Sequence, residues 1–276
     1  ILESVLHGNW IVSGDKVQEF QTAFSKKYSV AYSHMVNSGS SANLVMITAL
    51  KKRFRWHDGD EIIVSPVGFP TTIAPIIQNN LKPIFADIDD SLCLDLESVK
   101  SKITKKTKAV LFVGIGGNIG QYFEILDFCR KNELKMILDA AHMAGTKVDK
   151  IYQGMATSKT QVGWDADVTV YSFQAVKNLP TADSGMVCFK DKKYDTLSRQ
   201  ISWLGIDKDT FARTNRQGSY KWDYDVPSVE IWEESLMIQK TPEDTEATED
   251  NPVDGCTADD VETVAKIGVP SVGVST

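Results

Sequence analysis

The sequence predicts an α/β fold in which a mostly parallel, mixed β-sheet lies between helices. Short apolar runs suit buried strands, and the stretches between them carry apolar residues three and four positions apart, which is the spacing of a helix. Strands that alternate with helices need crossover connections, so neighbouring strands run parallel and helices cover both faces of the sheet. The expected strands are 30–36, 61–65, 82–87, 109–113, 136–139, 168–172 and 186–189.

Helices are expected between these strands. Apolar side chains at helical spacing mark a first helix, at Val17, Phe20 and Phe24. The same spacing marks a later helix, at Ile119, Tyr122, Phe123 and Leu126. Two further helices are expected, over 41–53 and 71–79.

Charge and composition narrow the class of protein. The chain has 276 residues, 30 Lys and Arg against 37 Asp and Glu, and a net charge of -7. Because nucleic-acid binding depends on clustered Lys and Arg, we expect no nucleic-acid partner. No uncharged apolar run approaches the roughly 18 residues of a membrane span, and Ile1 opens no signal-peptide pattern. The expectation is a cytoplasmic protein that binds no membrane.

The cysteines indicate no metal site. They form no CxxC pair and have no His at ligand spacing, and they are Cys93, Cys129, Cys188 and Cys256. This usage fits a reducing compartment, so we expect buried, unreactive thiols.

Residues 241–276 differ from the rest of the chain. They hold nine acids, one base and no aromatic residue. A segment of this composition can bury little apolar surface. We therefore expect a large domain over 1–226 and an atypical acidic segment over 227–276 that is not a complete small domain.

Small polar residues follow the first predicted strand. In an α/β sheet, ligands bind beyond the carboxyl ends of the strands. Here Gly39, Ser40 and Ser41 open a helix, whose unpaired N–H groups and positive dipole end could hold a phosphate. A plain serine N-cap of the helix explains the same residues.

Asp139 ends one later predicted strand, and Lys177 follows another. Asp139 is placed to hold a proton on a heterocycle nitrogen, or else to cap the next turn. Lys177 lies in a loop flanked by apolar residues, where partial desolvation would favour an imine-forming neutral amine; a solvated surface lysine is the alternative. Phe69 adds a flat surface for ring stacking. A phosphate cradle, a carboxylate and an amine are together what pyridoxal 5'-phosphate (PLP) requires.

Seven segments resemble those of a known family. In order, they are GNWIVSG, NSGSSANL, DGDEIIVSPVGFPTT, PIFADID, DAAHMAGT, SFQAVKN and WDYDV. From Gly8 to about Pro227 the chain thus resembles the DegT/DnrJ/EryC1/StrS family of PLP-dependent aminotransferases, which act on nucleotide-linked sugars. The resemblance implies the fold-type I architecture, with a large mixed-sheet domain, a smaller C-terminal domain and a homodimer with shared active sites.

The resemblance also implies roles for individual residues. Lys177 holds the cofactor's aldehyde and, with Asp139 at the pyridine nitrogen, is catalytic. His142 lies beside the ring, Phe69 covers one ring face, and serines hold the phosphate. The cofactor-binding set is Gly39, Ser40, Ser41, Phe69, Asp139, His142, Ser172 and Lys177, and no metal is expected.

The implied reaction is transamination of a nucleotide-linked keto-deoxysugar in amino-sugar and surface-polysaccharide biosynthesis, with L-glutamate as the amino donor. One branch of the family has histidine in place of the lysine and dehydrates the sugar at C3. The presence of Lys177 therefore favours transamination.

Two stretches depart from the family pattern. Ala182 and Ser184, within TADSG, stand where glycines are common, so we expect altered loop geometry with the chemistry retained. After Val226, residues 230–232 replace the family's Gly-Tyr-(Asn/Lys)-Tyr motif, and nothing beyond resembles the small domain. A truncated or frame-shifted gene would explain this loss.

Two alternative functions are compatible with the sequence. Gly114, Gly116 and Gly120 follow a strand and open a helix, and Asp139 ends the next strand, as in a nicotinamide dehydrogenase. That interpretation leaves SGSSAN and SFQAVKN unexplained. The other alternative is a truncated, non-catalytic PLP-fold fragment, because closing a water-excluded site normally needs both domains.

Overall fold

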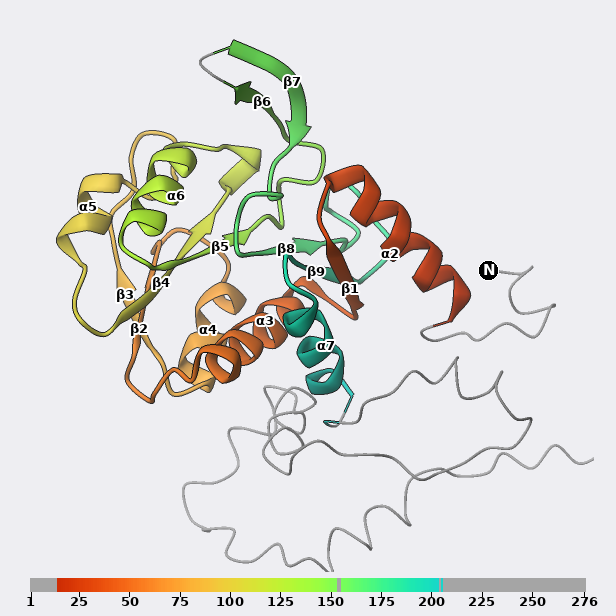
Figure 1. Ribbon diagram of the computed structural model, residues 1–276, viewed down its shortest axis with the longest axis horizontal. Coiled ribbons are helices and arrows are strands. Elements are labelled where there is room, and N and C mark those ends of the chain that lie inside the picture. The colour runs from red at the N-terminus through yellow and green to blue at the C-terminus, as the bar shows by residue number, and fades with distance from the viewer. Residues whose placement is uncertain (1–13, 153–154, 204, 206–276) are drawn as a thin grey trace, which may run out of the picture. The chain divides into compact units, whose positions relative to one another are not determined.

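The computed structural model describes residues 14–152, 155–203 and 205 (Figure 1). The predicted domain boundary at residue 226 and the acidic segment 227–276 lie outside these residues. Cys256 also lies outside them.

Seven strands form one sheet, at the places that the apolar runs predict. In the order in which they lie side by side, they are β1 (Tyr32–Val36), β9 (Gly185–Phe189), β8 (Val168–Ser172), β5 (Lys135–Asp139), β4 (Thr107–Val113), β2 (Glu61–Val64) and β3 (Lys82–Phe85). The five strands from β8 to β3 are parallel, and β9 is antiparallel to both of its neighbours. This arrangement confirms the predicted, mostly parallel mixed sheet.

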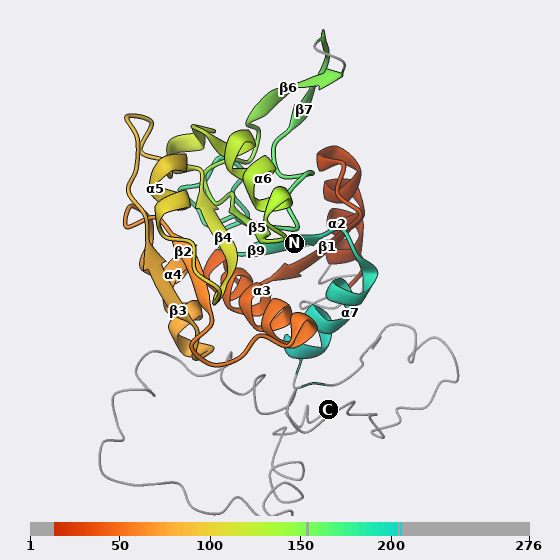
Figure 2. The same cartoon turned by 60° about the vertical axis from the view of Figure 1, so that its left-hand side comes forward.

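Helices lie on both faces of this sheet (Figures 1 and 2). They are α2 (Asp15–Tyr28), α3 (Gly39–Phe54), α4 (Pro70–Gln78), α5 (Leu96–Ser101), α6 (Tyr122–Lys131) and α7 (Lys192–Ile201), with a 3-10 turn η1 (Ile115–Gly117). The four predicted helices correspond to α2, α3, α4 and α6, whereas α5 and α7 were not predicted. A hairpin of β6 (Lys147–Tyr152) and β7 (Met155–Gln161), also not predicted, projects away from the sheet in both views.

Alternate side chains of β5 show how the sheet builds two hydrophobic cores. Met136 and Leu138 belong to a core that includes residues of α2 and α6, whereas Ile137 belongs to the core on the opposite face, which includes residues of α3 and α4. Burying one such side chain stabilises the fold by about 1.5–3 kcal/mol. Because α3 and α4 share one face, their first turns lie together near the carboxyl ends of the strands.

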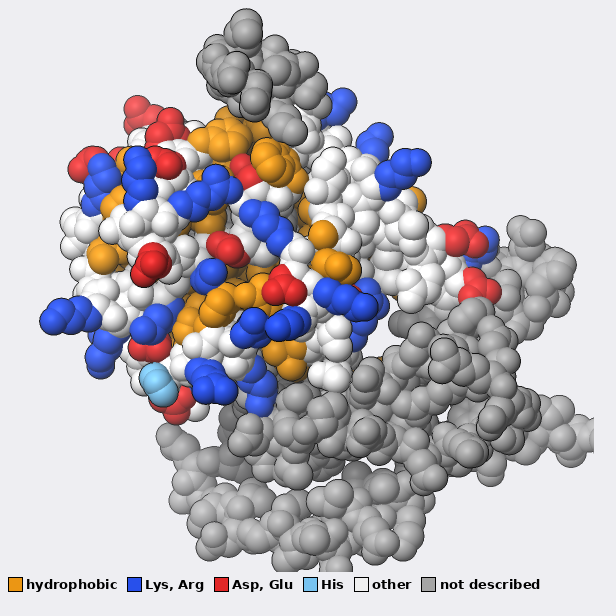
Figure 3. Space-filling model, in the orientation of Figure 1, with side chains coloured by type: hydrophobic (Ala, Val, Ile, Leu, Met, Phe, Trp, Pro, Cys, Tyr) orange, Lys and Arg blue, Asp and Glu red, His pale blue; other side chains and the backbone are white. Residues whose placement is uncertain are grey.

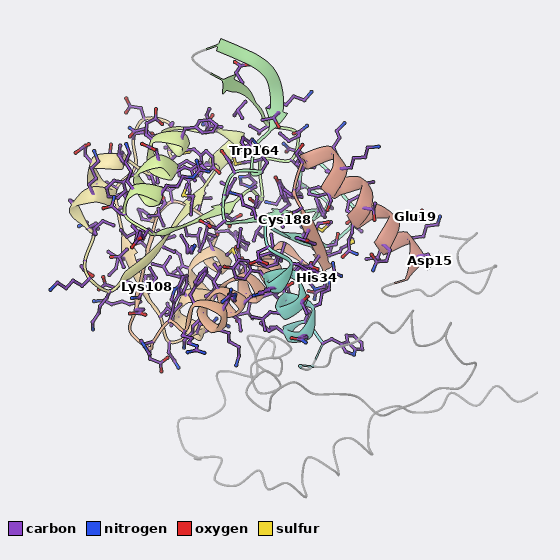
Figure 4. All side chains as sticks on the ribbon, in the orientation of Figure 1. Asp15, Glu19, His34, Lys108, Trp164 and Cys188 are labelled. Carbon is purple, nitrogen blue, oxygen red and sulfur yellow. The ribbon has the colours of Figure 1, made fainter. Side chains whose placement is uncertain are left out.

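The three cysteines within the described residues are free and buried, as predicted: Cys93, Cys129 and Cys188. Cys188 lies in the interior, on β9 (Figure 4). Burial raises the pKa of the Cys129 thiol to about 12 and also raises the pKa of Cys188. Because the thiolate is the reactive form, these thiols are unreactive near neutral pH.

On the face shown in Figure 3, Lys and Arg side chains lie among Asp and Glu side chains. The exposed ion pairs of the described residues include Lys131 with Asp127, at 2.6 Å. Each contributes less than about 1 kcal/mol, so the surface charges do little to hold the fold together. No helix within the described ranges is long and apolar enough to cross a membrane. The same ranges contain no group of three or more His, Cys, Asp or Glu that could hold a metal ion.

Candidate active site

The candidate site lies at the carboxyl ends of neighbouring parallel strands. Asp139 is the last residue of β5, and Ser172 is the last residue of β8. The chain leaves β5 into the turn that carries His142, and it leaves β8 into the loop that carries Lys177. Four of the predicted residues are thus brought to one edge of the sheet, where α/β proteins bind ligands.

The first turn of α3 lies against the end of β8. The Ser38 side chain accepts a hydrogen bond from the Ser41 backbone N–H at 3.1 Å, so the N-cap is Ser38 and the predicted Gly39, Ser40 and Ser41 form the first turn. A Cβ on Gly39 would lie only 2.7 Å from the Ser172 Cβ. Glycine therefore permits α3 to begin beside Ser172, with its positive dipole end at the site.

Ser40 connects the starts of two helices. Its hydroxyl donates a hydrogen bond to Thr71 Oγ1 at 3.0 Å, and Thr71 lies in the first turn of α4. Phe69 is the N-cap residue of α4 and is 68% exposed, so its ring is accessible to a flat ligand. The predicted phosphate-binding residues of α3 and the predicted ring-stacking residue Phe69 thus belong to two adjoining helix N-termini, whereas Ser172 lies at the end of β8.

The Asp139 carboxylate is buried and accepts three hydrogen bonds. Oδ2 accepts from Thr72 Oγ1 at 2.7 Å and from Asn43 Nδ2 at 3.1 Å, and Oδ1 accepts from the Ala141 backbone N–H at 3.1 Å. The last bond caps the turn after β5, as one interpretation of Asp139 predicted. The other interpretation, a partner for a ring nitrogen, uses the lone pairs that these bonds leave free.

Lys177 and His142 are in direct contact, with Lys177 Nζ 2.9 Å from His142 Nε2. Burial of the imidazole and, next, the charge of Lys177 lower the pKa of His142, whereas the Asp139 carboxylate acts in the opposite direction. The lowered pKa favours a neutral imidazole at pH 7, and its tautomer decides which group donates in the hydrogen bond between His142 and Lys177. Lys177, His142 and Asp139 therefore interact within a single site.

The Lys177 loop is tied to the turn after β5. The Asn178 side-chain amide donates hydrogen bonds to the backbone carbonyls of His142 and Ala144, both at 3.3 Å. These bonds hold the half-buried Lys177 beside His142.

The same loop contains the predicted departure from glycine. Ala182 has a φ of 76°, in the left-handed region that favours glycine. The loop thus adopts at Ala182 a conformation suited to the glycine that is common there, and the expected change in loop geometry stays a prediction. Ser184 is buried, and its hydroxyl is hydrogen-bonded to the Thr181 hydroxyl. The loop therefore carries strain at Ala182 and a compensating polar contact at Ser184.

We expect Ala182→Gly to raise the free energy of unfolding by about 0.5 kcal/mol. The glycine removes a Cβ that is unfavourable at this φ by about 1–2 kcal/mol, and the greater freedom of the unfolded chain offsets part of that gain. Ser184→Gly is the matched control. It should lower the free energy of unfolding, because it removes a buried hydrogen bond. Urea denaturation of both variants measures the effect, and a destabilised Ala182→Gly would contradict it.

Three residues of the site were not singled out by sequence reasoning: Asn43, Thr71 and Thr72. Asn43 lies one helical turn after Ser40, and the two threonines directly follow Phe69 and Pro70 at a helix start. Helical periodicity, extended from the motif residues already identified, could have found them.

The donor set suits PLP. The first turn of α3 and the neighbouring hydroxyls suit its phosphate, the buried Asp139 carboxylate suits a protonated ring nitrogen, and the Lys177 amine suits its aldehyde. A seven-stranded, mostly parallel sheet with these groups at its carboxyl edge is the large domain of a fold-type I PLP-dependent enzyme.

The chain belongs to the DegT/DnrJ/EryC1/StrS aminotransferase family, whose model matches residues 1–222. This family of PLP-dependent enzymes includes sugar aminotransferases and sugar 3-dehydratases. Its members bind PLP, so the nicotinamide-dehydrogenase alternative is not supported.

Three comparisons place the chain within this family. The spore coat polysaccharide biosynthesis protein SpsC of Bacillus subtilis is 33% identical over 227 residues, which are 82% of this chain and 55% of that protein. A GDP-4-keto-6-deoxy-D-mannose 3-dehydratase of Escherichia coli O55:H7 is 38% identical over 147 residues, 52% of this chain and 38% of that protein. The chain spans about half the length of the curated relatives it matches.

The third comparison is with solved structures of GDP-4-keto-6-deoxymannose-3-dehydratase. The structure with bound GDP-perosamine has a TM-score of 0.70 and 26% identity, and the match covers 86% of this chain and 63% of that chain. Another structure of this dehydratase holds a trapped PLP-glutamate geminal diamine. Relatives of this chain thus bind nucleotide sugars and, with PLP, glutamate.

Proposed function

We propose that this protein is a PLP-dependent aminotransferase that moves the amino group of L-glutamate to a nucleotide-linked keto-deoxysugar, in amino-sugar and surface-polysaccharide biosynthesis. The observation that carries the proposal is the Lys177 amine, held 2.9 Å from His142 in the loop after β8. By the family resemblance, this is where the dehydrating branch has histidine. The similarity to a polysaccharide biosynthesis protein and to an enzyme of GDP-linked keto sugars supports the substrate class.

In this proposal the residues described above hold PLP at three places. Gly39, Ser40, Ser41 and Ser172 would bind the phosphate. Phe69 and His142 would contact the ring, and Asp139 would accept the N–H of the ring nitrogen. When bound, PLP supplies an electron sink for the electrons released at the α-carbon of the amino donor.

Lys177 performs the proton transfers. Its amine takes a proton from the α-carbon of glutamate, and in the second half of the exchange it delivers a proton to the sugar carbon. His142 orients this amine through their hydrogen bond. Proton transfer by a positioned group contributes about 10²- to 10⁴-fold to the rate. Over the whole cycle glutamate gives up its amino group and takes an oxygen from one water to become 2-oxoglutarate, and the keto oxygen of the sugar leaves as water.

The proposed assembly is a homodimer with shared active sites. Phe69, beside the first turn of α4, and Val176, next to Lys177, are 68% and 79% exposed. Burying an exposed apolar side chain is favourable. In the proposed assembly a second copy of the chain covers these two side chains.

Mass analysis of the products from a panel of nucleotide-linked keto sugars, incubated with glutamate and PLP, tests the proposed reaction. The expected product carries an amino group and a hydrogen in place of the keto oxygen. A product that has lost water instead would assign the protein to the dehydratase reaction. PLP binding without any product would favour the non-catalytic alternative for this chain.

A further inference from the structure

The groups that contact Asp139 come from two helices that are distant in sequence. Thr72, in the first turn of α4, is 67 residues away from Asp139, and Asn43, in α3, is 96 residues away. All three side chains are almost fully buried, with exposed fractions of 2% for Thr72, 4% for Asn43 and 3% for Asp139. The two helices therefore supply a dry, preformed set of donors to the last residue of β5.

The same two helices also hold the proposed phosphate site. Ser40 and Asn43 are three residues apart in α3, so they share one side of that helix. Thr71 accepts from the Ser40 hydroxyl at 3.0 Å, and the adjacent Thr72 donates to Asp139. The first turns of α3 and α4 thus position both the hydroxyls proposed to bind the PLP phosphate and the Asp139 carboxylate proposed to bind the PLP ring.

Asn43 is placed there at a cost to stability. Its Oδ1 atom is buried and has no hydrogen-bond partner in the described part of the chain, whereas its Nδ2 donates to Asp139. An unpaired buried acceptor is unfavourable, and a leucine of similar size would avoid it. The position is therefore explained by the contact with Asp139 better than by packing.

The hydrogen bonds to Asp139 are unevenly divided between its two oxygens. Oδ2 accepts two, from Thr72 and Asn43, which occupies both of its lone pairs. Oδ1 accepts one, from the Ala141 backbone N–H, and retains a lone pair.

We propose that Thr72 and Asn43 are positioning residues, which fix the Asp139 carboxylate so that Oδ1 is the oxygen that accepts the N–H of the PLP ring. This inference rests on the proposed PLP-dependent function and adds two residues to it. Thr72 and Asn43 act through Asp139 and need not touch the cofactor themselves.

Binding of two ligands to the full chain tests this inference. One is PLP, and the other is its analogue in which a CH group replaces the ring nitrogen and cannot donate to Asp139. The wild type should prefer PLP. Thr72→Val, which removes only the hydroxyl, should weaken PLP binding by about 10-fold and leave the affinity for the analogue unchanged. Thr72→Ser should restore the preference, because it retains the hydroxyl.

Asn43→Leu provides a second, independent measurement. It should reduce the preference for PLP while leaving the thermal midpoint of the protein without cofactor equal to or above that of the wild type. Thr48→Val is the matched control, since Thr48 is a buried hydroxyl on the same helix that bonds only the Leu44 carbonyl, at 2.9 Å. It should leave the preference unchanged.

The outcomes separate the inference from the proposed function. If Thr72→Val weakens the binding of PLP and of the analogue equally, or weakens the binding of neither, Thr72 does not act through the ring nitrogen. The inference then fails while PLP binding stands. If Asn43→Leu lowers the thermal midpoint and keeps the preference, Asn43 is a packing residue. If the wild type binds neither ligand, the proposed cofactor role fails and the inference fails with it.

Discussion

Replacing Lys177 by alanine is expected to lower the turnover of glutamate and keto sugar by at least about 10³-fold. The amine is held 2.9 Å from His142 and is the group proposed to carry the protons. General acid–base transfer alone accounts for about 10²- to 10⁴-fold, and loss of the covalent hold on the cofactor adds to it. The measurement is the rate of 2-oxoglutarate formation, together with the visible absorption of the bound cofactor, which should shift when the covalent link is lost.

Lys108→Ala is the matched control for this substitution. Lys108 lies near the start of β4, at the opposite end of that strand from the site, and pairs with Asp60 at 3.7 Å (Figure 4). Its replacement should leave turnover unchanged.

Added methylamine should restore part of the activity of Lys177→Ala, because a free amine can take over the proton transfer. Full activity of Lys177→Ala would remove Lys177 from its proposed role.

The strands and the residues at their ends could be predicted from the sequence because one property identifies both. A strand buried on both faces must be apolar along its whole length, as at Ile137 and Leu138, so the first polar residue after it is conspicuous. Asp139 was found in this way, as the final residue of its strand. Ser172 also ends its strand, but it was identified only through the family resemblance.

The elements that were not predicted lack this signal. The hairpin of β6 and β7 is rich in Lys, Thr and Ser and shows no regular alternation of apolar residues. Helix α5 is only six residues long, too short for a helical period to repeat. Helix α7 is a different case, because Tyr194, Leu197 and Ile201 do have helical spacing and could have been recognised.

The contacts within the site could not be predicted from local pattern. Ser40 reaches Thr71 and Thr72 reaches Asp139 only because α3 and α4 pack on the same face of the sheet. Periodicity shows that a helix has an apolar face but not which helix lies beside it. The residue types at the site were therefore accessible from sequence, and their partners were not.

Gly185→Ala is expected to be the most damaging substitution outside the catalytic residues. Gly185 begins β9, where it pairs with Val36 of β1 and Ser172 of β8. A Cβ at this position would lie 2.3 Å from the Ser38 carbonyl oxygen and 2.7 Å from the Gly39 backbone nitrogen. Because the strand is held on both sides, the start of α3 must move. We expect a loss of about 3 kcal/mol in the free energy of unfolding and a loss of PLP affinity of about 100-fold or more.

Gly68→Ala separates this effect from the general consequences of losing a glycine. A Cβ on Gly68 would meet only Val113 Cγ2, at 3.8 Å, which is an ordinary contact. That variant should keep both stability and PLP affinity, as measured by thermal unfolding without cofactor and by titration with PLP. If Gly185→Ala unfolds more easily yet binds PLP as the wild type does, the first turn of α3 is not the phosphate site. If Gly185→Ala loses both stability and PLP affinity while Gly68→Ala keeps both, the position of α3 against β9 determines cofactor binding. The reason is that the displaced backbone includes the N–H groups that would face the phosphate.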